Sequence, residues 1–488
     1  MGLIIWILIA LLGGLYITGP IADPDLWWHI TTGRWIIAHR AVPVVDHWNM
    51  FGAGKEWRAY SWLCEVLFAA IERLYGVEGL MFLKAAFGVM VSLSLCYAFG
   101  RIAKDWMFGS LLGLYATVSL FNHFTLRPQA VTWALFAVAL CFADSFAEGR
   151  ARGKALAMLC VVSLFWANIH ITSIFGILAV FLWCAGAGGS LSLSLKPSLF
   201  MAVFLLFTPY FGGEVFSLIS QSTHPFSYST VAEFQPAQIN HYSTGFLVIL
   251  LAVYFIFLHF RASTFPKAHL LMVALFAFMG LAVIKFMPYG VIAAGAAIAY
   301  LWRQNEGSEC GLGMLGRGLL RLREIYFSHI EGNGFAVFVL ALCAVHVAGI
   351  SGSPLLSYAQ LPVKAVDFIE KHHLPKPILN LFGDGGYLMY RYSREDGTPK
   401  MLVAIDGRTN VVPFEIMKKH SSAVRGRLDW KEYFNAVKPN TVLWRTEGPL
   451  TAILKETGNW CMVYRDGDLD RGHVVFVKEE FSNGLPCL

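Results

Sequence analysis

The sequence predicts a polytopic α-helical membrane protein that ends in a small α/β domain. Hydrophobic residues make up 56% of its 488 residues and charged residues only 14%, whereas soluble domains contain about 25% charged residues. The charges are also unevenly placed, because 34 of the 70 Asp, Glu, Lys and Arg residues lie within the last 138 positions. These observations exclude an ordinary soluble enzyme. They predict a membrane domain over residues 1–351, followed by a water-soluble domain over residues 352–488.

Eleven apolar segments are long enough to cross, or nearly cross, a hydrocarbon core of about 30 Å. The first has no basic segment before it and no small-residue cleavage site after it, so we expect a retained span and not a cleaved signal peptide. The apolar segment 60–75 carries three charged residues, and we expect it to lie along the membrane as an interfacial helix. The expected spans lie near 2–19, 79–99, 106–121, 129–147, 155–169, 172–186, 197–211, 244–260, 268–284, 286–302 and 333–351.

The basic residues predict how these spans are oriented. Twelve Lys and Arg residues fall in one set of alternate loops, whereas the other short loops contain only Arg127 and Lys285. Because Lys and Arg are enriched in cytoplasmic loops, we expect a cytoplasmic N-terminus and place both the loop 19–78 and the C-terminal domain outside. The net charge of +6 therefore says little about partners, and nucleic acid is not indicated. The twelve residues are Arg101, Lys104, Arg150, Arg152, Lys154, Lys196, Arg261, Lys267, Arg303, Arg317, Arg321 and Arg323.

The first predicted external loop opens with two carboxylates, Asp23 and Asp25, directly after the first span. Two carboxylates at the end of a membrane helix can supply a general base, and a metal ligand, at the water boundary. The alternative is a structural role, with the Trp residues in an aromatic belt and Asp25 as a helix N-cap. The following segment is expected to lie flat as an amphipathic helix, because its apolar residues can share one stripe. The stripe consists of Leu26, Trp27, Ile30, Trp35 and Ile37.

Other polar residues that are unusual in a membrane domain fall on the same predicted outer face. Lys84 lies within the outer end of the second span, where an ammonium group is costly unless it reaches the interface or an anion. Taken singly, each of these residues can be an interfacial residue at a helix end. Their convergence on one face favours a functional site. The others are Arg127, Asn168, His170, Glu214, Glu233, His241 and Lys285.

From residue 363 onwards, short β-rich runs alternate with amphipathic helices, which predicts an α/β domain with a mainly parallel sheet. Strands are expected near 378–382, 401–405, 441–444, 460–464 and 473–477. The glycine-rich turn 383–386 favours either an anion cradle or a tight strand-to-helix turn. The segment 406–408 favours either a ligand site at a strand end or a local ion pair. The nine scattered cysteines indicate neither a disulfide framework nor a structural zinc site.

Several short motifs follow one another along most of the chain. They are DPDLWWHITTGRWIIAH from Asp23, SWLCEVLF from Ser61, RPQ from Arg127, WANIH from Trp166, EFQP from Glu233, GGYL from Gly385 and IDGR from Ile405. Together with the predicted topology, this order resembles an uncharacterised bacterial branch of the GT-C superfamily of membrane glycosyltransferases. The resemblance implies a bacterial cytoplasmic membrane, with the C-terminal domain in the periplasm or outside the cell.

The resemblance also implies a reaction, in which a sugar moves from a polyprenyl-phosphate-linked donor to a glycan, lipid or protein acceptor on the outer face, with inversion at the anomeric carbon. The acceptor needs a general base, for which Asp25 is the first candidate and Asp23 the second. The departing lipid phosphate needs positive charge near the bilayer surface, and the candidates are Arg127, Lys84 and Lys285. Such a donor needs no Gly-rich nucleotide loop, and the membrane domain contains none.

Further residues are implied to position the substrates, and the resemblance allows a divalent cation, Mg or Mn, beside the acidic motif. The positioning candidates are His29, Trp28, His170 and Glu233. The candidate ligands of the cation are Asp23, Asp25 and Glu233. Either histidine can instead be a satisfied imidazole at a helix end.

Two other classes of protein compete with the glycosyltransferase. A transporter or flippase of a lipid-linked or anionic solute needs ionisable groups near the membrane centre and usually has paired repeats. The sequence shows no such repeat, and its polar residues gather at one face. A non-catalytic membrane scaffold leaves the acidic motif and the cations at the helix ends without a reason.

Overall fold

The computed structural model describes residues 2–187, 190–222, 231–259, 267–305, 356–357, 360–467, 472–482 and 484–488. The chain divides into two compact units. The first unit comprises Met1–Gly19, Met81–Gly212 and Ala232–Ser353, and the second comprises Pro20–Leu80, Gly213–Val231 and Pro354–Leu488. The expected span 333–351 and the expected domain boundary after residue 351 lie outside the described residues, as do Arg261, Arg317, Arg321 and Arg323.

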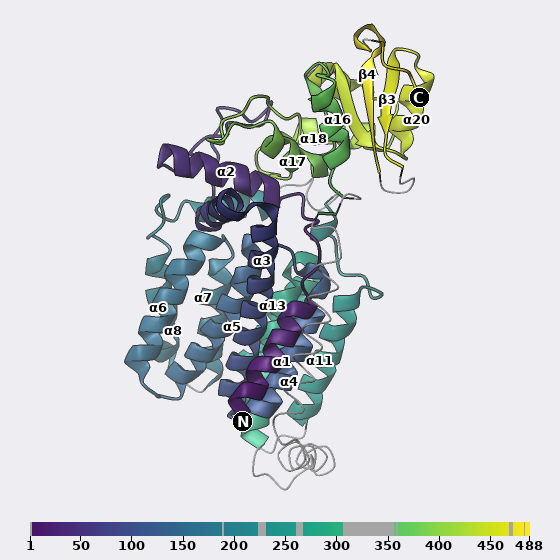
Figure 1. The fold of residues 1–488 in the computed structure, drawn as a ribbon. Helices are drawn as coiled ribbons and strands as arrows, with labels where there is room; N and C mark the ends of the chain where they lie inside the picture. The colour runs from purple at the N-terminus through teal and green to yellow at the C-terminus, as the bar shows by residue number, and fades with distance from the viewer. Residues whose placement is uncertain are drawn as a thin grey trace. The chain divides into compact units, whose positions relative to one another are not determined.

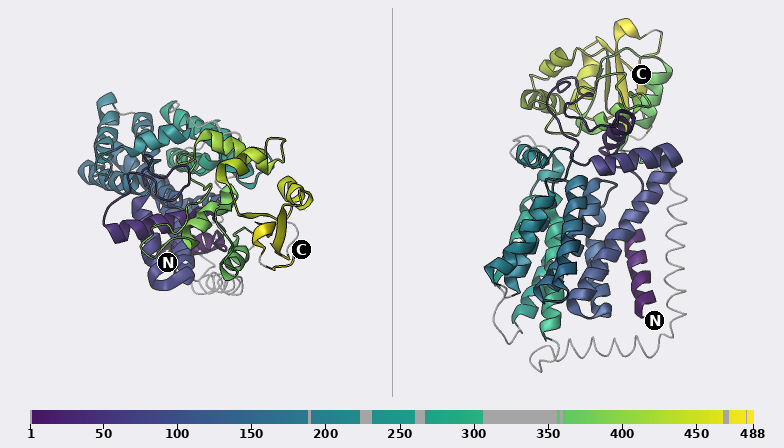
Figure 2. Two further views of the ribbon diagram at one scale, coloured as in Figure 1. Left: turned by 90° about the horizontal axis from the view of Figure 1, so that it is seen from above. Right: turned by 90° about the vertical axis from the view of Figure 1, so that its left-hand side faces the viewer.

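The first unit is a bundle of apolar helices that run alongside one another (Figures 1 and 2). Five helical segments within the described residues are long and apolar enough to cross a membrane, and five shorter helices are also apolar. The protein is therefore a multi-pass membrane protein. The helices are α1 (Gly2–Tyr16), α3 (Trp62–Ala103, which also enters the second unit), α4 (Trp106–Ser119), α5 (Pro128–Ala147), α6 (Arg152–Ile169), α7 (Ser173–Gly186), α8 (Leu191–Phe204), α11 (Tyr242–His259), α12 (Lys267–Ala282) and α13 (Met287–Asn305).

These helices match the expected spans in order and, with one exception, in position. The segment expected at 197–211 forms α8 over Leu191–Phe204 instead, so it begins six residues earlier. The reason is a local N-cap: the hydroxyl of Ser190 accepts a hydrogen bond from the Leu193 amide at 3.3 Å. Sequence hydropathy does not detect this cap, because the residues that follow Ser190 include two further serines and a lysine.

Small residues let the helices of the bundle approach closely. A side chain on Gly14 of α1 would overlap the backbone of Val89 in α3, and one on Gly88 would overlap the Gly14 carbonyl. Helix α13 is covered on most sides, with Ala293, Ala294 and Ala296 fully buried. Since lipid tails are as apolar as the side chains, such close packing is a main source of helix association in a membrane.

Ion pairs of the bundle lie at both ends of α5. At its C-terminal end, Arg303 contacts Asp144 at 2.8 Å and Glu148 at 3.0 Å, and Lys104 contacts Glu148 at 3.2 Å. Arg127 is the N-cap at the other end of this helix, and a helix of 20 residues is about 30 Å long. Lys104 and Arg303, two of the residues that the sequence placed in cytoplasmic loops, therefore meet at one end of α5, and Arg127 lies at the other.

In the second unit, helix α2 (Leu26–His39) is buried over all sides of its first two turns. The expected single apolar stripe is therefore wrong. The backbone carbonyl of Glu65 in α3 leaves no room for a side chain on Gly33, and the Trp27 ring meets Tyr387 and Tyr390 of α17 (Gly385–Arg391) at 5.1 and 4.9 Å. Protein covers this helix on several sides. The segment expected as an interfacial helix forms the start of α3, which is interrupted at Gly76 by a positive φ of 64°.

The C-terminal sheet has four strands in the order β1-β2-β4-β3. Only β1 (Ile378–Leu379) and β2 (Thr441–Arg445) pair in parallel. Strand β4 (His473–Lys478) is antiparallel to both β2 and β3 (Trp460–Arg465), so the expected mainly parallel sheet is wrong. No helix separates β3 from β4 within the described residues, and strands joined without a crossover helix pair antiparallel. The remaining helices are α9 (Glu214–Ser222), α16 (Val363–Lys371), α18 (Phe414–Val424), α19 (Lys431–Val437) and α20 (Pro449–Glu456).

The segment expected as a strand at 401–405 does not join this sheet. Its Val403 instead exchanges backbone hydrogen bonds with the first loop, from the Met50 amide to the Val403 carbonyl and from the Val403 amide to the Trp48 carbonyl, both at 2.9 Å. The β-rich pattern was correct for an extended segment, but its partner lies some 350 positions away in sequence, which periodicity cannot reveal. The loop and the C-terminal segment therefore fold as one unit.

A disulfide joins Cys461 of β3 to Cys487 near the C-terminus, 26 positions further along the sequence. The scattered cysteines had not indicated this pair. Replacing both cysteines with alanine in the full chain is expected to destabilise the second unit by about 3 kcal/mol, because the cross-link restricts the unfolded chain. Thermal unfolding with and without reductant measures the effect. An unchanged midpoint in the variant and in reduced wild type would show that the bond adds no stability.

Candidate functional site

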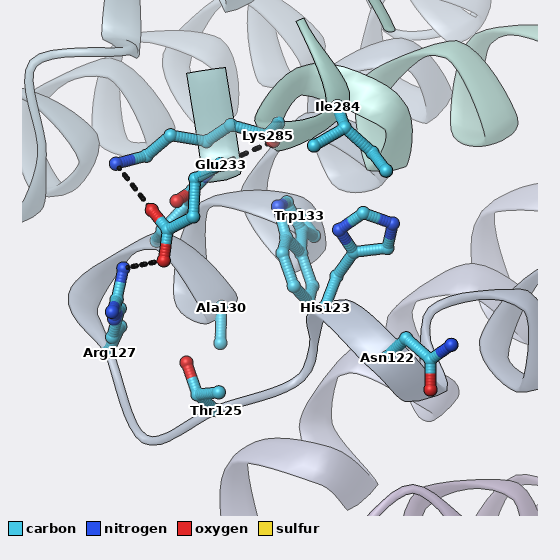
Figure 3. A pocket seen from close by; sticks show the side chains of 10 residues that line it. Asn122, His123, Thr125, Arg127, Ala130, Trp133, Glu233, Ile284 and Lys285 are labelled. Carbon is cyan, nitrogen blue, oxygen red and sulfur yellow. Dashed lines mark hydrogen bonds and ion pairs between the residues drawn. The ribbon is translucent and has the colours of Figure 1, made fainter. Parts of the chain in front are cut away.

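A carboxylate is held between two cations at one end of the first unit. Arg127 Nη1 lies 2.6 Å from Glu233 Oε1, and Lys285 Nζ lies 3.2 Å from Glu233 Oε2 (Figure 3). Both oxygens of the carboxylate are therefore engaged by cations. Arg127 and Lys285, two of the three residues expected to bind phosphate, therefore come together around Glu233. The sequence had proposed Glu233 only for substrate positioning or as a metal ligand.

Local sequence explains how the three side chains are held. Arg127 precedes Pro128, which disfavours a helical backbone at the preceding residue, and Arg127 is indeed extended with φ −125° and ψ 156°. Backbone hydrogen bonds join the Glu233 loop to the Lys285 loop, from the Ala237 amide to the Leu281 carbonyl at 2.8 Å and from the Ile284 amide to the Gln235 carbonyl at 3.0 Å. The side-chain amide Nε2 of Gln129 also donates to the Lys285 backbone carbonyl at 3.1 Å.

A pocket of about 90 Å³ opens beside this ion triplet. Two of its polar atoms, Trp133 Nε1 and His123 Nε2, are buried without a hydrogen-bond partner among the residues that the structure describes. Trp133 is only 2% exposed, so its unsatisfied N–H is costly unless a ligand or water accepts from it. The pocket is lined by Asn122, His123, Thr125, Arg127, Gln129, Ala130, Trp133, Glu233, Ile284 and Lys285 (Figure 3).

The pocket carries a net positive charge at neutral pH. Burial alone would raise the pKa of Glu233, but Arg127 and Lys285 outweigh it and hold this pKa at about 2. Burial, reinforced by Lys285 and Arg127, lowers the pKa of His170 to about 3. Burial and the neighbouring His241 lower the pKa of His123 to about 4 against the pull of Glu233. With both imidazoles neutral, two cations face one carboxylate.

The other two candidates of this unit have contacts of their own. His170 ends α6, where its Nδ1 lies 3.0 Å from the Thr172 hydroxyl and accepts from the Thr172 amide at 3.3 Å. This is the arrangement of a helix-end imidazole. Lys84 is 4% exposed and donates to the Gly19 carbonyl at 2.8 Å. Its ammonium group is therefore engaged just beyond the end of α1, which weakens its case as a phosphate ligand.

The acidic motif lies in the second unit. Asp23 is 4% exposed, and its Oδ1 accepts a hydrogen bond from the Asp25 amide at 2.9 Å. Asp25 is partly exposed, and its carboxylate does not cap α2. Its Oδ1 lies against Gly407, where any side chain would overlap it. The two carboxylates therefore differ: Asp23 holds the backbone, whereas Asp25 presents its carboxylate beside the IDGR segment.

His29 and Trp28 are buried in the second unit. His29 Nδ1 lies 3.1 Å from Glu65 Oε1, and the two side chains are 5% and 1% exposed. Trp28 is 3% exposed, and its ring centroid lies 3.5 Å from that of His29. His29 packs against Glu65 and Phe68 of α3, and Trp28 packs against Trp57 of the first loop, so both rings help to hold α2 in place. Their role in positioning a substrate stays a prediction.

No group of three or more His, Cys, Asp and Glu side chains among the described residues is arranged to hold a metal ion. Glu233 itself faces two cations, Arg127 and Lys285. A cation beside Asp23 and Asp25 stays a prediction, and no chemical step is assigned to a metal.

Sequence reasoning missed a buried ion cluster in the second unit. Arg408 contacts Asp406 through two nitrogens, at 2.8 and 3.0 Å, and Asp46 at 2.7 Å. Asn49 also donates to Asp406 at 3.0 Å. The local pair within 406–408 was one of the two expected alternatives, but Asp46 lies 362 positions away. The sequence does show Asp46, an aspartate three residues after Pro43 in the first loop. It does not show that Arg408 is the partner of this aspartate.

Comparisons with known proteins identify the fold. No family model and no curated protein matches the sequence. Among solved structures, the oligosaccharyltransferase of Archaeoglobus fulgidus tethered to an acceptor peptide with the NVT sequon aligns with a TM-score of 0.55 at 12% identity. The oligosaccharyltransferase AglB from the same organism, in complex with an inhibitory peptide and a dolichol-phosphate, aligns with a TM-score of 0.57 at 12% identity. Each alignment covers 91% of this chain and 69% of the other.

A third structure of the Archaeoglobus oligosaccharyltransferase, complexed with Zn and sulfate, aligns with a TM-score of 0.50 at 12% identity over 91% of this chain and 68% of the other. At this identity the likeness is one of fold. The expected resemblance to membrane glycosyltransferases is therefore confirmed for the fold, which by itself does not specify the function of this chain.

Proposed function

We propose that this protein is a membrane glycosyltransferase that moves a sugar from a polyprenyl-phosphate donor to an acceptor on the outer face of the membrane. The observation that carries the proposal is the convergence of Arg127 and Lys285 at a pocket with unsatisfied polar atoms. Two fixed cations beside a pocket suit a phosphate group. The dolichol-phosphate and the acceptor peptide bound by oligosaccharyltransferases of the same fold support a lipid-linked donor and a glycan, lipid or protein acceptor.

In the proposed reaction, an acceptor oxygen or nitrogen attacks the anomeric carbon from the face opposite the phosphate. The bond between that carbon and the phosphate oxygen breaks, and its electron pair stays on the phosphate. Inversion follows from this single displacement. Asp25 takes the proton that the acceptor loses, and Asp23 holds the Asp25 backbone. Arg127 and Lys285 stabilise the negative charge that develops on the lipid phosphate.

The proposed location is a bacterial cytoplasmic membrane, with the N-terminus inside and the C-terminal domain outside. Lys104, Arg150 and Arg303 gather around Glu148 at one end of α5, opposite Arg127, which supports the alternation of inner and outer loops. The disulfide between Cys461 and Cys487 supports an oxidising compartment for the C-terminal domain.

The test is a transfer assay with the full chain in lipid nanodiscs. Radiolabelled polyprenyl-phosphate sugars are supplied with acceptors extracted from cells, and both labelled product and released polyprenyl phosphate are measured. Wild type is expected to turn over at least one donor, whereas absence of turnover across a broad donor panel would favour transport or scaffolding.

Arg127→Gln is expected to weaken binding of polyprenyl phosphate by about 10- to 100-fold, because a charge-assisted hydrogen bond contributes roughly 1.5–3 kcal/mol. Binding is measured directly in nanodiscs by titration. The control is Arg152→Gln, which removes the same charge at the first residue of α6, where Arg152 is exposed. Equal weakening by both variants would mean that lipid phosphate binds through general attraction and not in this pocket.

A further inference from the structure

We infer that Glu233 makes the cation pocket selective for a singly charged phosphodiester over a diphosphate. This inference rests on the proposed function, because it concerns the donor of the same site. A sugar linked through one phosphate is a phosphodiester, whereas a sugar linked through a diphosphate brings additional negative charge. Glu233 would distinguish the two by cancelling one of the two positive charges that face the ligand.

The geometry makes Glu233 part of the pocket wall, although its side chain is 40% exposed. Its two oxygens contact different cations, so it fixes the spacing of Arg127 and Lys285 as well as their charge. The Lys285 ammonium also lies 5.1 Å from the centre of the Phe234 ring, the residue next to Glu233. Together with the backbone hydrogen bonds between the two loops, these contacts hold the carboxylate in the pocket wall.

The charge balance follows from the ionisation of the neighbouring groups. The low pKa of Glu233 keeps its carboxylate ionised throughout the physiological range, and the low pKa values of His123 and His170 keep both imidazoles neutral there. The pocket therefore offers a net single positive charge. A phosphodiester neutralises this charge, whereas a diphosphate would place excess negative charge beside a carboxylate that cannot easily be protonated, and like charges at close range are repulsive.

The unsatisfied polar atoms fit an uncharged or weakly charged part of the ligand. Trp133 Nε1 can only donate a hydrogen bond, and neutral His123 can donate or accept through Nε2. These groups can bind a phosphodiester oxygen or a sugar hydroxyl without adding charge.

The experiment compares lipids that differ in phosphate charge but not in chain. Farnesyl methyl phosphate, a phosphodiester, and farnesyl diphosphate are titrated into the full chain in nanodiscs of uncharged lipid. Wild type is expected to prefer the phosphodiester. Glu233→Gln is expected to shift the ratio of the two affinities towards the diphosphate by about three- to tenfold, which is the range of a partly exposed charge interaction. Glu233→Asp keeps the charge and is expected to keep the preference.

The matched control is Glu148→Gln, which removes one carboxylate from the cation cluster at the other end of α5 and should leave the ratio unchanged. An unchanged ratio in Glu233→Gln, while Arg127→Gln still weakens both lipids, overturns this inference and leaves the proposed function standing. A lower affinity for both lipids in Glu233→Gln overturns it as well, because Glu233 would then be needed to organise the cations. If Arg127→Gln changes the binding of neither lipid, the proposed function itself fails.

Discussion

Asp25→Asn is expected to lower turnover by about 10²- to 10⁴-fold, because an amide cannot take the proton that the acceptor loses. The structure favours Asp25 over Asp23 as the base, since Asp25 is partly exposed and does not cap its helix, whereas Asp23 is buried and accepts a hydrogen bond from the Asp25 amide. The measurement is kcat in the nanodisc assay, together with the affinity for the donor. Donor affinity should stay within about twofold, because phosphate binding is assigned to Arg127 and Lys285.

The control for this substitution is Glu56→Gln, which removes one negative charge from the same first loop at an exposed side chain. It should leave kcat unchanged. Asp23→Asn is expected to reduce turnover less than Asp25→Asn, since it disturbs only the position of the base. Full turnover in a folded Asp25→Asn variant would contradict the assignment, and a larger loss in Asp23→Asn would move the base to that residue.

Arg408→Met is expected to destabilise the second unit by about 3–5 kcal/mol, because it leaves two buried carboxylates without their cation. The side chains of Arg408, Asp46 and Asp406 are at most 1% exposed. The guanidinium also lies 4.7 Å from the centre of the Trp57 ring, so the residue joins the first loop to the C-terminal segment by charge and by stacking. Thermal unfolding of the full chain should show the corresponding transition lowered by roughly 10 °C.

Arg391→Met provides a close control for burial. Arg391 also contacts two carboxylates, Asp367 and Glu370, in the same unit, but its side chain is 22% exposed and that of Asp367 is 56% exposed. Solvent screens such a pair, so its loss should cost only about 0–1 kcal/mol. Equal shifts for Arg391→Met and Arg408→Met would show that the buried cluster contributes no more than a surface pair.

The sequence predicted the membrane spans better than the strand pairing of the C-terminal domain, and the reason is physical. Apolar spans could be predicted almost to their ends, because a helix in lipid must satisfy its own backbone hydrogen bonds and needs only a long apolar segment. Helix α8 was displaced because the Ser190 cap is a local polar contact. In the C-terminal domain the strands 441–444, 460–464 and 473–477 were expected correctly, but their pairing was not, because alternation identifies an extended segment and not its neighbour.

In the candidate site too, the sequence predicted single residues but not the contacts between them. Arg127, Lys285, Asp23 and Asp25 stood out in the sequence because charges are costly at the edge of a membrane span. The sequence by itself therefore determined that the protein is a multi-pass membrane protein. It also determined the apolar helices and the polar residues that such helices cannot easily carry. Only the tertiary structure decided that Glu233 lies between Arg127 and Lys285, which are far apart in sequence, and that Asp46 shares Arg408 with Asp406. Each of these contacts depends on where separate segments pack, and a property of single segments cannot specify it.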